Sequence, residues 1–547
     1  MRVKLKLVSG LGKVFHDQEP ESYPEGCPAS LLGGEVFSLQ AAYALQQPWW
    51  GDLPRVRVDF DCNLPLRVRQ VTGVPVRFPK YADSAGAYLR DVPGIYPDIL
   101  RDLADTRDIC LYPGFWSSLW VDIEPAPETP AGEYPLKVTI LSQGGGVLAE
   151  AGITLLLLDA RLPEQKLICS RWLHTDSLAS VYRLPMFSVE HIRVLRGFLH
   201  LASRRGINMA FTPIHTPPIL VQDGRERPEA QLVDVFVTPL GYTFRFTKLR
   251  DFISLCRHEG IKYFEMAHFY SPRGGYHAAT IMGVKDGTYS TLFGPRTPAD
   301  DPEYQAFLSA YIPALIQELS YIDVLHQCFF HLTDMPGEGD RAQYRKLLAL
   351  TGPLLSSRPV IDTPPGPDFP DEDAPGLTPV PELDQLAGFN GTERWASLGC
   401  RRRGAYPDTL IAMPGNRARV MGAQLYVEQI RGISHWALNY YAAQSAGYPI
   451  DPYINTDCDG LAPAGDAHLL YPGQGGAPEE SIRMMHFLQA LQDLRALQAL
   501  EKKAGRGKAL DIIRQGLDCP LSFTKYPTDE AWLLGLRHRV NLAITAN

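Results

Sequence analysis

The sequence has no long apolar run and no excess of basic residues. It carries 53 Lys and Arg against 61 Asp and Glu, a net charge of −8, and this balance argues against a nucleic-acid-binding surface. The most apolar stretch, residues 153–158, is far too short to cross a membrane. The first seven residues alternate between polar and apolar side chains, which predicts a strand and not a signal peptide. We therefore expect neither nucleic acid nor a membrane among the partners.

Cysteine pairs and cofactor motifs are also absent from the sequence. The nine cysteines are odd in number, widely spread and never spaced as Cys-x-x-Cys, which indicates free thiols in a reducing, cytoplasmic setting. No phosphate loop, no Gly-x-Gly-x-x-Gly turn and no His-Glu-x-x-His motif occurs. His and Asp residues are present, but no pair has the spacing of a metal site. We expect no cofactor and no metal.

The length and the strand pattern predict several domains, of which the first is all-β. A chain of 547 residues corresponds to two to four domains at roughly 150 residues each. Alternating runs separated by Pro/Gly turns recur up to about residue 160, which is the pattern of a β-sandwich. These runs cover residues 55–60, 66–69, 74–78, 118–123, 134–140 and 153–158.

Beyond Lys166, strand-like runs alternate with helix-length amphipathic runs, as in a (β/α)8 TIM-type barrel. The expected strands are 167–174, 207–212, 261–268, 328–333, 358–362, 393–399, 432–438 and 468–471. The expected helices are 188–205, 247–258, 302–325, 339–352, 416–429 and 479–499, with a surface loop at 362–380. The sequence thus predicts a multidomain α/β protein: a β-sandwich over 1–162, the barrel over 163–500 and a helical C-terminal extension over 501–547.

Polar and aromatic residues recur at the carboxyl ends of the expected strands, and a barrel would bring them to one rim. They are Trp172, His174, Asp176, Thr212, His215, Glu265, His268, Asp334, Asp362, His435, Trp436, Asn439 and Tyr440. Aromatic faces stack on sugars, carboxylates act as acids or bases, and amide, imidazole and hydroxyl groups bind sugar hydroxyls. Each residue alone is more often structural, but their shared position predicts a glycan or glycoside site.

One apolar stretch, residues 328–336 (CFFHLTDMP), stands out within this pattern. It reads as a buried strand that ends in the carboxylate of Asp334, because Pro336 biases the residue before it towards an extended conformation and stops the strand. His331 and Thr333 lie on the opposite face of that strand from Asp334. A carboxylate at the carboxyl end of a strand is where α/β enzymes place their chemistry.

The order of these motifs resembles one protein family. The motifs are 172–176 (WLHTD), 211–218 (FTPIHTPP), 231–234 (QLVD), 263–265 (YFE), 330–334 (FHLTD), 416–419 (NRAR), 432–439 (GISHWALN), 463–466 (PAGD) and 492–497 (QDLRAL), with 94–98 and 119–122 in the β-rich start. Together they are similar to the domain of unknown function 4091 superfamily, which contains glycoside hydrolase family 123. The resemblance covers nearly the whole chain.

The resemblance implies a β-sandwich followed by a (β/α)8 barrel that acts on β-linked N-acetylhexosamines, notably N-acetylgalactosamine. It also implies substrate-assisted catalysis, in which an Asp positions the 2-acetamido group and the adjacent Glu is the general acid. Asp334 matches that Asp, but Met335 stands where the resemblance implies Glu. Met has no proton to give, and losing such an acid removes roughly 10²–10⁴ in rate.

A second departure follows the third expected strand, where residues 271–275 read SPRGG in place of a Gln-Trp-Gly-Ala run. Three hypotheses remain open. Glu338 or Glu265 supplies the proton, although Glu338 also suits the start of a helix. Alternatively, the substrate is an anionic sugar, or one with a good leaving group, and Arg273 binds it. In the third, the site binds a glycan without catalysis. The sugar, the linkage and a homo-oligomeric state are left open.

Overall fold

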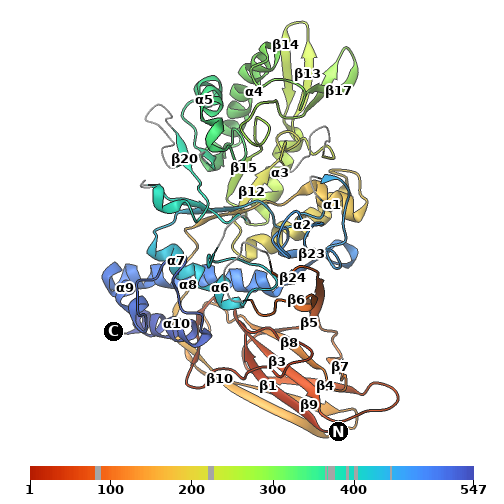
Figure 1. Cartoon of the computed structure of the whole chain (residues 1–547), viewed down its shortest axis with the longest axis vertical. Helices are drawn as coiled ribbons and strands as arrows, with labels where there is room; N and C mark the ends of the chain where they lie inside the picture. Colours follow the sequence, from red (N-terminus) through yellow and green to blue (C-terminus); the bar gives the residue numbers. More distant parts are fainter. Residues whose placement is uncertain are drawn as a thin grey trace.

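The structure is a computed structural model that describes residues 1–80, 88–219, 227–363, 366, 376–389, 393–399, 404–443 and 446–546. Its β-rich N-terminal part lies at one end of the molecule, a parallel sheet lies in the middle, and a smaller sheet lies at the other end (Figure 1). Within the described ranges, no helix combines the length and apolar character that a membrane span requires. The chain is a multidomain α/β protein.

Two sheets make up the N-terminal part. The seven-stranded sheet has the order β1 (Val3–Ser9), β3 (Phe37–Leu45), β8 (Trp116–Ile123), β5 (Leu66–Val76), β6 (Gly94–Asp102), β24 (Pro478–Ser481) and β23 (Leu470–Pro472). The five-stranded sheet has the order β2 (Ala29–Gly33), β10 (Val147–Arg161), β9 (Gly132–Ser142), β4 (Arg55–Asp61) and β7 (Asp108–Cys110). Alternate side chains of both sheets, such as Leu39 and Val138, bury into one shared core.

The middle sheet has six parallel strands. Their order is β18 (Cys328–Phe329), β15 (Tyr263–Met266), β12 (Met209–Thr212), β11 (Ile168–Arg171), β22 (Gly432–His435) and β21 (Trp395–Ser397). Phe330 forms a parallel bridge with Val360 of β19 (Val360–Asp362), which pairs in parallel with β20 (Leu377–Pro379). Another parallel bridge joins Glu382 to Ser397. Short, almost wholly buried strands of this kind suit a parallel sheet covered by helices.

The helices follow the amphipathic runs of the sequence. They are α1 (Thr175–Tyr182), α2 (Val189–Arg204), α3 (Thr247–His258), α4 (Pro302–Tyr321), α5 (Arg341–Leu355), α6 (Gly415–Arg419), α7 (Met421–Val427), α8 (Ile482–Ala504), α9 (Arg506–Arg514) and α10 (Glu530–Thr545). Several begin at a residue that caps the free N–H groups. Ser188 caps α2, and Asp301 caps α4 directly before Pro302.

A four-stranded sheet at the far end comes from insertions into this pattern. Its order is β14 (Gly241–Arg245), β13 (Asp234–Thr238), β16 (Ile281–Lys285) and β17 (Thr288–Phe293), and it lies beside α4 at the top of Figure 1. At the opposite side of the molecule, α10 packs on α8 and on β2 and β10. The C-terminal helices therefore contact the N-terminal sheets.

Two of the expected strands and one expected loop differ from the structure. The expected strand 468–471 is wrong as a member of the middle sheet, because β23 pairs with β24 at the edge of the seven-stranded sheet. Part of the expected loop 362–380 forms β20 instead, and the rest of it lies largely outside the described residues. The expected strand 328–333 is much shorter, since β18 ends at Phe329 and only Phe330 continues the pairing.

Candidate active site

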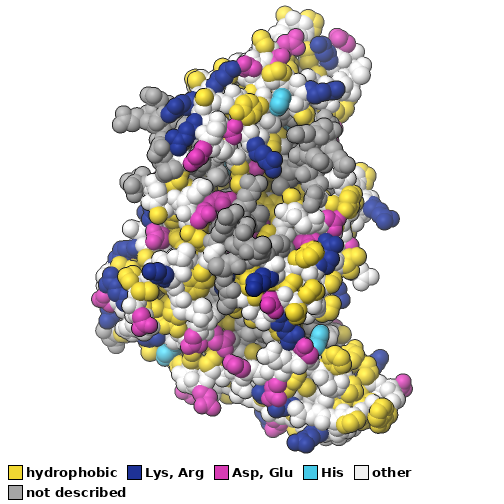
Figure 2. Space-filling model, in the orientation of Figure 1, with side chains coloured by type: hydrophobic (Ala, Val, Ile, Leu, Met, Phe, Trp, Pro, Cys, Tyr) yellow, Lys and Arg dark blue, Asp and Glu magenta, His cyan; other side chains and the backbone are white. Residues whose placement is uncertain are grey.

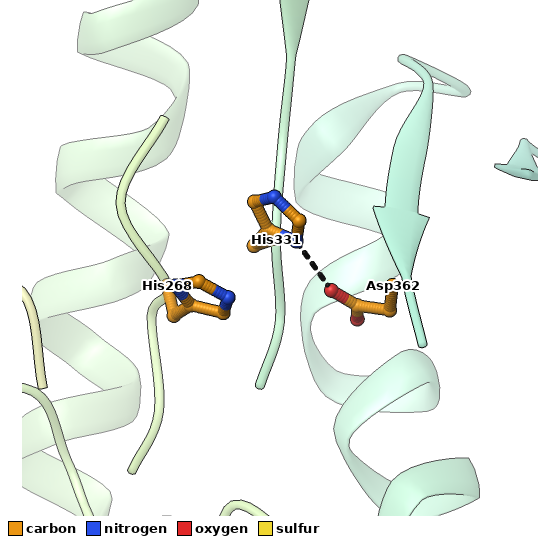
Figure 3. A group of neighbouring side chains, drawn as sticks. All are labelled: His268, His331 and Asp362. Atoms are coloured by element: carbon orange, nitrogen blue, oxygen red, sulfur yellow. Dashed lines mark hydrogen bonds and ion pairs between the residues drawn. The ribbon is translucent and has the colours of Figure 1, made fainter. Parts of the chain in front are cut away.

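Polar side chains converge beyond the carboxyl ends of β11, β15, β18 and β19. His331 lies between two buried carboxylates: its Nδ1 is 2.8 Å from Asp362 Oδ1, and its Nε2 is 2.7 Å from Glu265 Oε1. Figure 3 shows His331 beside Asp362, with its ring facing that of His268. Burial alone would lower the pKa of His331, but the hydrogen bonds and the negative charges of Asp362 and Glu265 raise it to about 9. His331 is therefore an imidazolium at neutral pH.

Glu265 has both carboxylate oxygens engaged. Oε1 accepts a hydrogen bond of 2.8 Å from Trp172 Nε1 as well as pairing with His331, and Oε2 accepts one from Ser170 Oγ. Glu265 is fully buried in β15, and its partners come from Ser170 on β11, from Trp172 directly after β11 and from His331 beyond β18. Its partners thus hold the carboxylate in one orientation.

Asp362 is equally well supported. It accepts hydrogen bonds from Tyr344 Oη at 2.7 Å and from the Leu332 backbone N–H at 3.1 Å, besides pairing with His331. The bond to Leu332 shows why regular pairing stops after Phe330: a side chain takes the place of the next backbone acceptor. The sequence placed Asp362 on the rim without a role and gave no sign of Tyr344, whose helix only the tertiary fold brings close.

His268, His331 and Asp362 are also close enough to hold a metal ion, with one ligand atom each within 4.8 Å of the others. However, the rings of His268 and His331 stack at 4.2 Å with an interplanar angle of 20°, so their in-plane lone pairs do not converge on one point. Both nitrogens of His331 already face carboxylates. A protonated imidazole in a hydrogen-bonded network accounts for this group better than a metal centre.

His268 stays neutral beside that imidazolium. Burial, together with the charge of His331, lowers the pKa of His268 well below its usual value. Its backbone carbonyl lies 2.7 Å from His215 Nε2, and neither His215 Nδ1 nor His268 Nδ1 has a partner in the described part of the chain. Burial lowers the pKa of His215 to about 4. The ring of Trp172 meets that of His268 edge to face at 5.5 Å and stacks on that of Phe211 at 4.7 Å.

A second cluster lies where β11 and β22 end. Arg227 holds Asp176 through two hydrogen bonds, of 2.8 and 2.7 Å, and its Nη2 is 3.0 Å from His174 Nδ1. Burial would raise the pKa of Asp176, but the adjacent guanidinium outweighs it and lowers the pKa. Burial and Arg227 lower the pKa of His174 to about 3. The sequence gave no indication of Arg227, because its loop carries no motif.

Three residues that follow β22 complete this second cluster. Asn439 accepts a hydrogen bond of 2.8 Å from the His174 backbone N–H and donates one of 3.2 Å to its carbonyl. Trp436 donates from Nε1 to Asp466 at 2.7 Å, and its ring meets that of Tyr440 at 5.5 Å. Trp436 is partly exposed, whereas Asn439 and Tyr440 are buried. This cluster is a hydrogen-bonded frame with one accessible aromatic face.

Asp334 is less buried than the group of His331, Glu265 and Asp362, and it lies in a loop that contacts the loop 271–275. The Arg273 backbone N–H donates to the Asp334 carbonyl at 2.7 Å. Asp334 and Met335 are half-buried, while Glu338 and Arg273 are exposed. Glu338 begins a single 3₁₀ turn, Glu338–Asp340, directly before α5. The structure thus brings Asp334, Met335 and Arg273 together, with Glu338 on the adjoining turn.

Comparisons with known proteins bear on the family and the fold of this chain. Residues 172–500 match the family model of the glycoside hydrolase 123 catalytic domain. A solved structure of a family 123 glycoside hydrolase from Clostridium perfringens, described for glycolipid glycan hydrolysis, matches with a TM-score of 0.69 at 12% identity, over 99% of this chain and 98% of that one. At that identity the likeness shows the fold alone.

A second solved structure is far less similar. The β-glucuronidase of Parabacteroides merdae matches with a TM-score of 0.27 at 9% identity, over 86% of this chain and 50% of that one. So low a score carries no argument about this chain. No curated protein matches it.

Proposed function

The chain belongs to the glycoside hydrolase 123 family, and from this premise we propose that it hydrolyses β-linked N-acetylhexosamine, of the N-acetylgalactosamine type, or a related glycan. The observation that carries the proposal is the position of Asp334, which lies in the loop beyond β18, shortly after the buried His331 that pairs with Glu265 and Asp362. A carboxylate at this end of a parallel sheet is suitably placed for catalysis.

In the proposed reaction, Asp334 positions the 2-acetamido group of the substrate, whose carbonyl oxygen attacks the anomeric carbon. Met335 cannot protonate the leaving oxygen. Glu338 is the stronger candidate for a relocated acid, because it is exposed and its side chain makes no hydrogen bond or ion pair with the described residues. Glu265 is the weaker candidate, because both of its oxygens are already engaged. Acid catalysis is therefore altered in this chain.

The proposal includes the architecture that supports this site. We propose that the parallel pairings from β11 through β12, β15 and β18 to β19, β20, β21 and β22 form a (β/α)8-type barrel, in which β20 occupies the place expected for residues 468–471. The domain limits at 162 and 500 are part of this proposal. The free thiols of the described cysteines support a cytoplasmic location.

The sugar-contacting residues are proposed from the same rim. Of the ten residues expected to bind substrate, Arg273 and Trp436 are the two that are not buried. We assign direct contact to these two. The other eight, which shape the rim from behind, are Trp172, His174, Asp176, His215, His268, His331, Asn439 and Tyr440.

A second candidate function is carbohydrate binding without catalysis, on the same hydrolase fold. Met335 and the fully engaged Glu265 favour it, because neither can donate a proton as the site stands. In that case the rim recognises a glycan but does not cleave it.

The two functions are separated by a panel of aryl glycosides (N-acetylgalactosaminide, N-acetylglucosaminide, galactoside and glucuronide). Hydrolysis by the wild type that falls by about 10²–10⁴ in Asp334→Asn supports the enzyme. Loss of that activity in Glu338→Gln, but not in Glu265→Gln at equal folded content, identifies Glu338 as the acid. A wild type that is inert on every aryl glycoside, while Met335→Glu hydrolyses an N-acetylhexosaminide, supports the binding protein.

A further inference from the structure

The loops 271–275 and 333–340 fit closely against each other at the outer side of the site. Besides the bond from Arg273 to Asp334, Thr333 Oγ1 donates to the Ser271 carbonyl at 2.5 Å. Gly274 has a φ of +96°, which favours glycine, and a Cβ added there would lie 2.5 Å from Tyr276 Cε2 and 2.7 Å from Asp340 Cγ, so that these side chains would have to move. The two loops therefore hold each other in place.

Both loops contain a residue in a left-handed backbone conformation. The φ of Arg273 is +56° and that of Met335 is +48°. For a residue other than glycine this conformation costs about 1–2 kcal/mol, and it persists where the surrounding structure requires it, commonly at functional sites. The side chains of Arg273 and Met335 are therefore held on a backbone that their own conformational preferences do not favour.

The guanidinium of Arg273 is exposed and makes no hydrogen bond or ion pair with the described residues. By contrast, Arg227 in the neighbouring cluster is buried and paired with Asp176. Gly274 and Gly275 also have a positive φ, and their backbone N–H groups donate to no described residue. Successive N–H groups in such a turn, next to an unpaired guanidinium, are donors of the kind that bind anions.

We propose that Arg273 binds an anionic group of the substrate next to the scissile bond, and that the leaving group departs as an anion, such as a phosphate or a carboxylate. This inference rests on the proposed function and takes the case in which no relocated acid is needed. Because Met335, beside Asp334, has no proton to give, a leaving group that needs protonation would depart slowly. An anion that is stable without a proton, and whose charge a guanidinium stabilises, does not need the acid.

With a glycosyl phosphate as substrate, the reaction takes two steps. The acetamido oxygen bonds to C1, and the C1–O bond to phosphate breaks with its electron pair leaving on the phosphate oxygen. The amide N–H, positioned by Asp334, keeps its proton in a cyclic cation. Water then bonds to C1, and the bond between C1 and the acetamido oxygen breaks, which restores the amide. The extra proton of the water passes to solvent. No oxidant, reductant or further reactant is consumed.

The test compares N-acetyl-β-galactosamine 1-phosphate with the neutral methyl β-N-acetylgalactosaminide. Calorimetric Kd values and phosphate release are measured for the full-length wild type, Arg273→Met and Arg257→Met. Arg257 on α3 is the matched control, because it is also exposed and its side chain has no partner in the described part of the chain. We expect Arg273→Met to weaken binding of the phosphate about tenfold to a hundredfold and binding of the neutral glycoside much less, whereas Arg257→Met should change neither.

Four outcomes would overturn the inference. Equal phosphate affinities in wild type and Arg273→Met would show that Arg273 does not bind the anion. Asp334-dependent hydrolysis of neutral aryl hexosaminides, without faster release of phosphate, would leave the proposed function standing and refute the anionic leaving group. Dependence of phosphate release on Glu338 would show that protonation is needed. Failure to bind or cleave any hexosaminide, anionic or neutral, would refute the proposed function as well.

Discussion

Two buried groups of charges in this protein differ in how they are paired. At the junction between the N-terminal sheets and the rest of the chain, Glu480 of β24 binds Arg69 at 2.5 Å and also Arg205. Nearby, Arg483 of α8 holds Asp98 at 2.8 Å. Burial would raise the pKa of Glu480 and of Asp98, but the arginines, and for Asp98 also Lys13 at 3.7 Å, outweigh it and hold each pKa at about 2. Each of these carboxylates faces a permanently charged partner.

At the candidate active site the charges are matched differently. His331, which can lose its proton, is the cation for both Glu265 and Asp362. On the loop 271–275, which contacts the loop of Asp334, the permanent cation of Arg273 has no partner in the described part of the chain. The junction pairs its buried carboxylates mainly with arginines and serves to hold the chain together, whereas the site keeps a titratable imidazolium between two carboxylates and one unpaired guanidinium. Charged groups that lack an ion-pair partner, or whose partner can lose its proton, are therefore the better candidates for functional residues.

The largest effect is expected from breaking the junction with Glu480→Gln. The substitution keeps the shape but leaves Arg205 buried without its counter-charge and Arg69 with Asp122 alone, so we expect the free energy of unfolding to fall by about 3–5 kcal/mol. Urea unfolding followed by circular dichroism measures it. Glu479→Gln is the matched control, because Glu479 meets the exposed Arg101 at 3.4 Å and should cost at most about 1 kcal/mol. Equal losses in the two variants would contradict a structural role for the junction.

The next effect is a pH dependence that separates the two regions. The pKa of His331 is about 9 in the folded protein and near 6.5 when unfolded. Its contribution of about 3 kcal/mol is therefore fully present below pH 6.5 and is lost as the pH rises through 9. Glu480 behaves in the opposite sense: its contribution is present above pH 4.5 and is lost as the pH falls through about 2.

Urea unfolding of wild type and His331→Gln between pH 3 and pH 10 tests this separation. We expect the substitution to remove much of the alkaline loss and to leave the acid loss unchanged, since Glu480 and Asp98 belong to the junction. An alkaline loss of the same size in both proteins would show that His331 is not the group that titrates.

The sequence predicted the helices better than the strands. The expected helix 247–258 coincides with α3, and 188–205 differs from α2 by one residue at each end, because a helix's apolar period is written within one segment. The expected strand 468–471 was placed in the wrong sheet, since a short apolar run does not reveal which strand it pairs with. The strand β20 was missed because its surroundings read as a loop rich in Pro and acidic residues.

The same distinction applies to the site. The sequence brought Glu265 and Asp362 to one rim, because each lies near the carboxyl end of an expected strand, and it placed His331 on the strand face opposite Asp334. It did not reveal that His331 lies between the other two, or that Tyr344 supports Asp362 from a helix. Those contacts depend on how strands and helices are oriented in three dimensions, which no local pattern records.

The smallest effect is expected at Arg273, and its sign is opposite to that at the junction. Because the φ of Arg273 is +56° and its side chain contacts no charged partner in the described part of the chain, Arg273→Gly should raise the free energy of unfolding by about 1 kcal/mol. Arg257→Gly, in the last turn of α3, should lower it by at most about 1 kcal/mol. Thermal unfolding with urea titration resolves both. A residue that the fold would be more stable without, and whose removal weakens anion binding, is one kept for function; a loss of stability in Arg273→Gly would show instead that its side chain supports the loop.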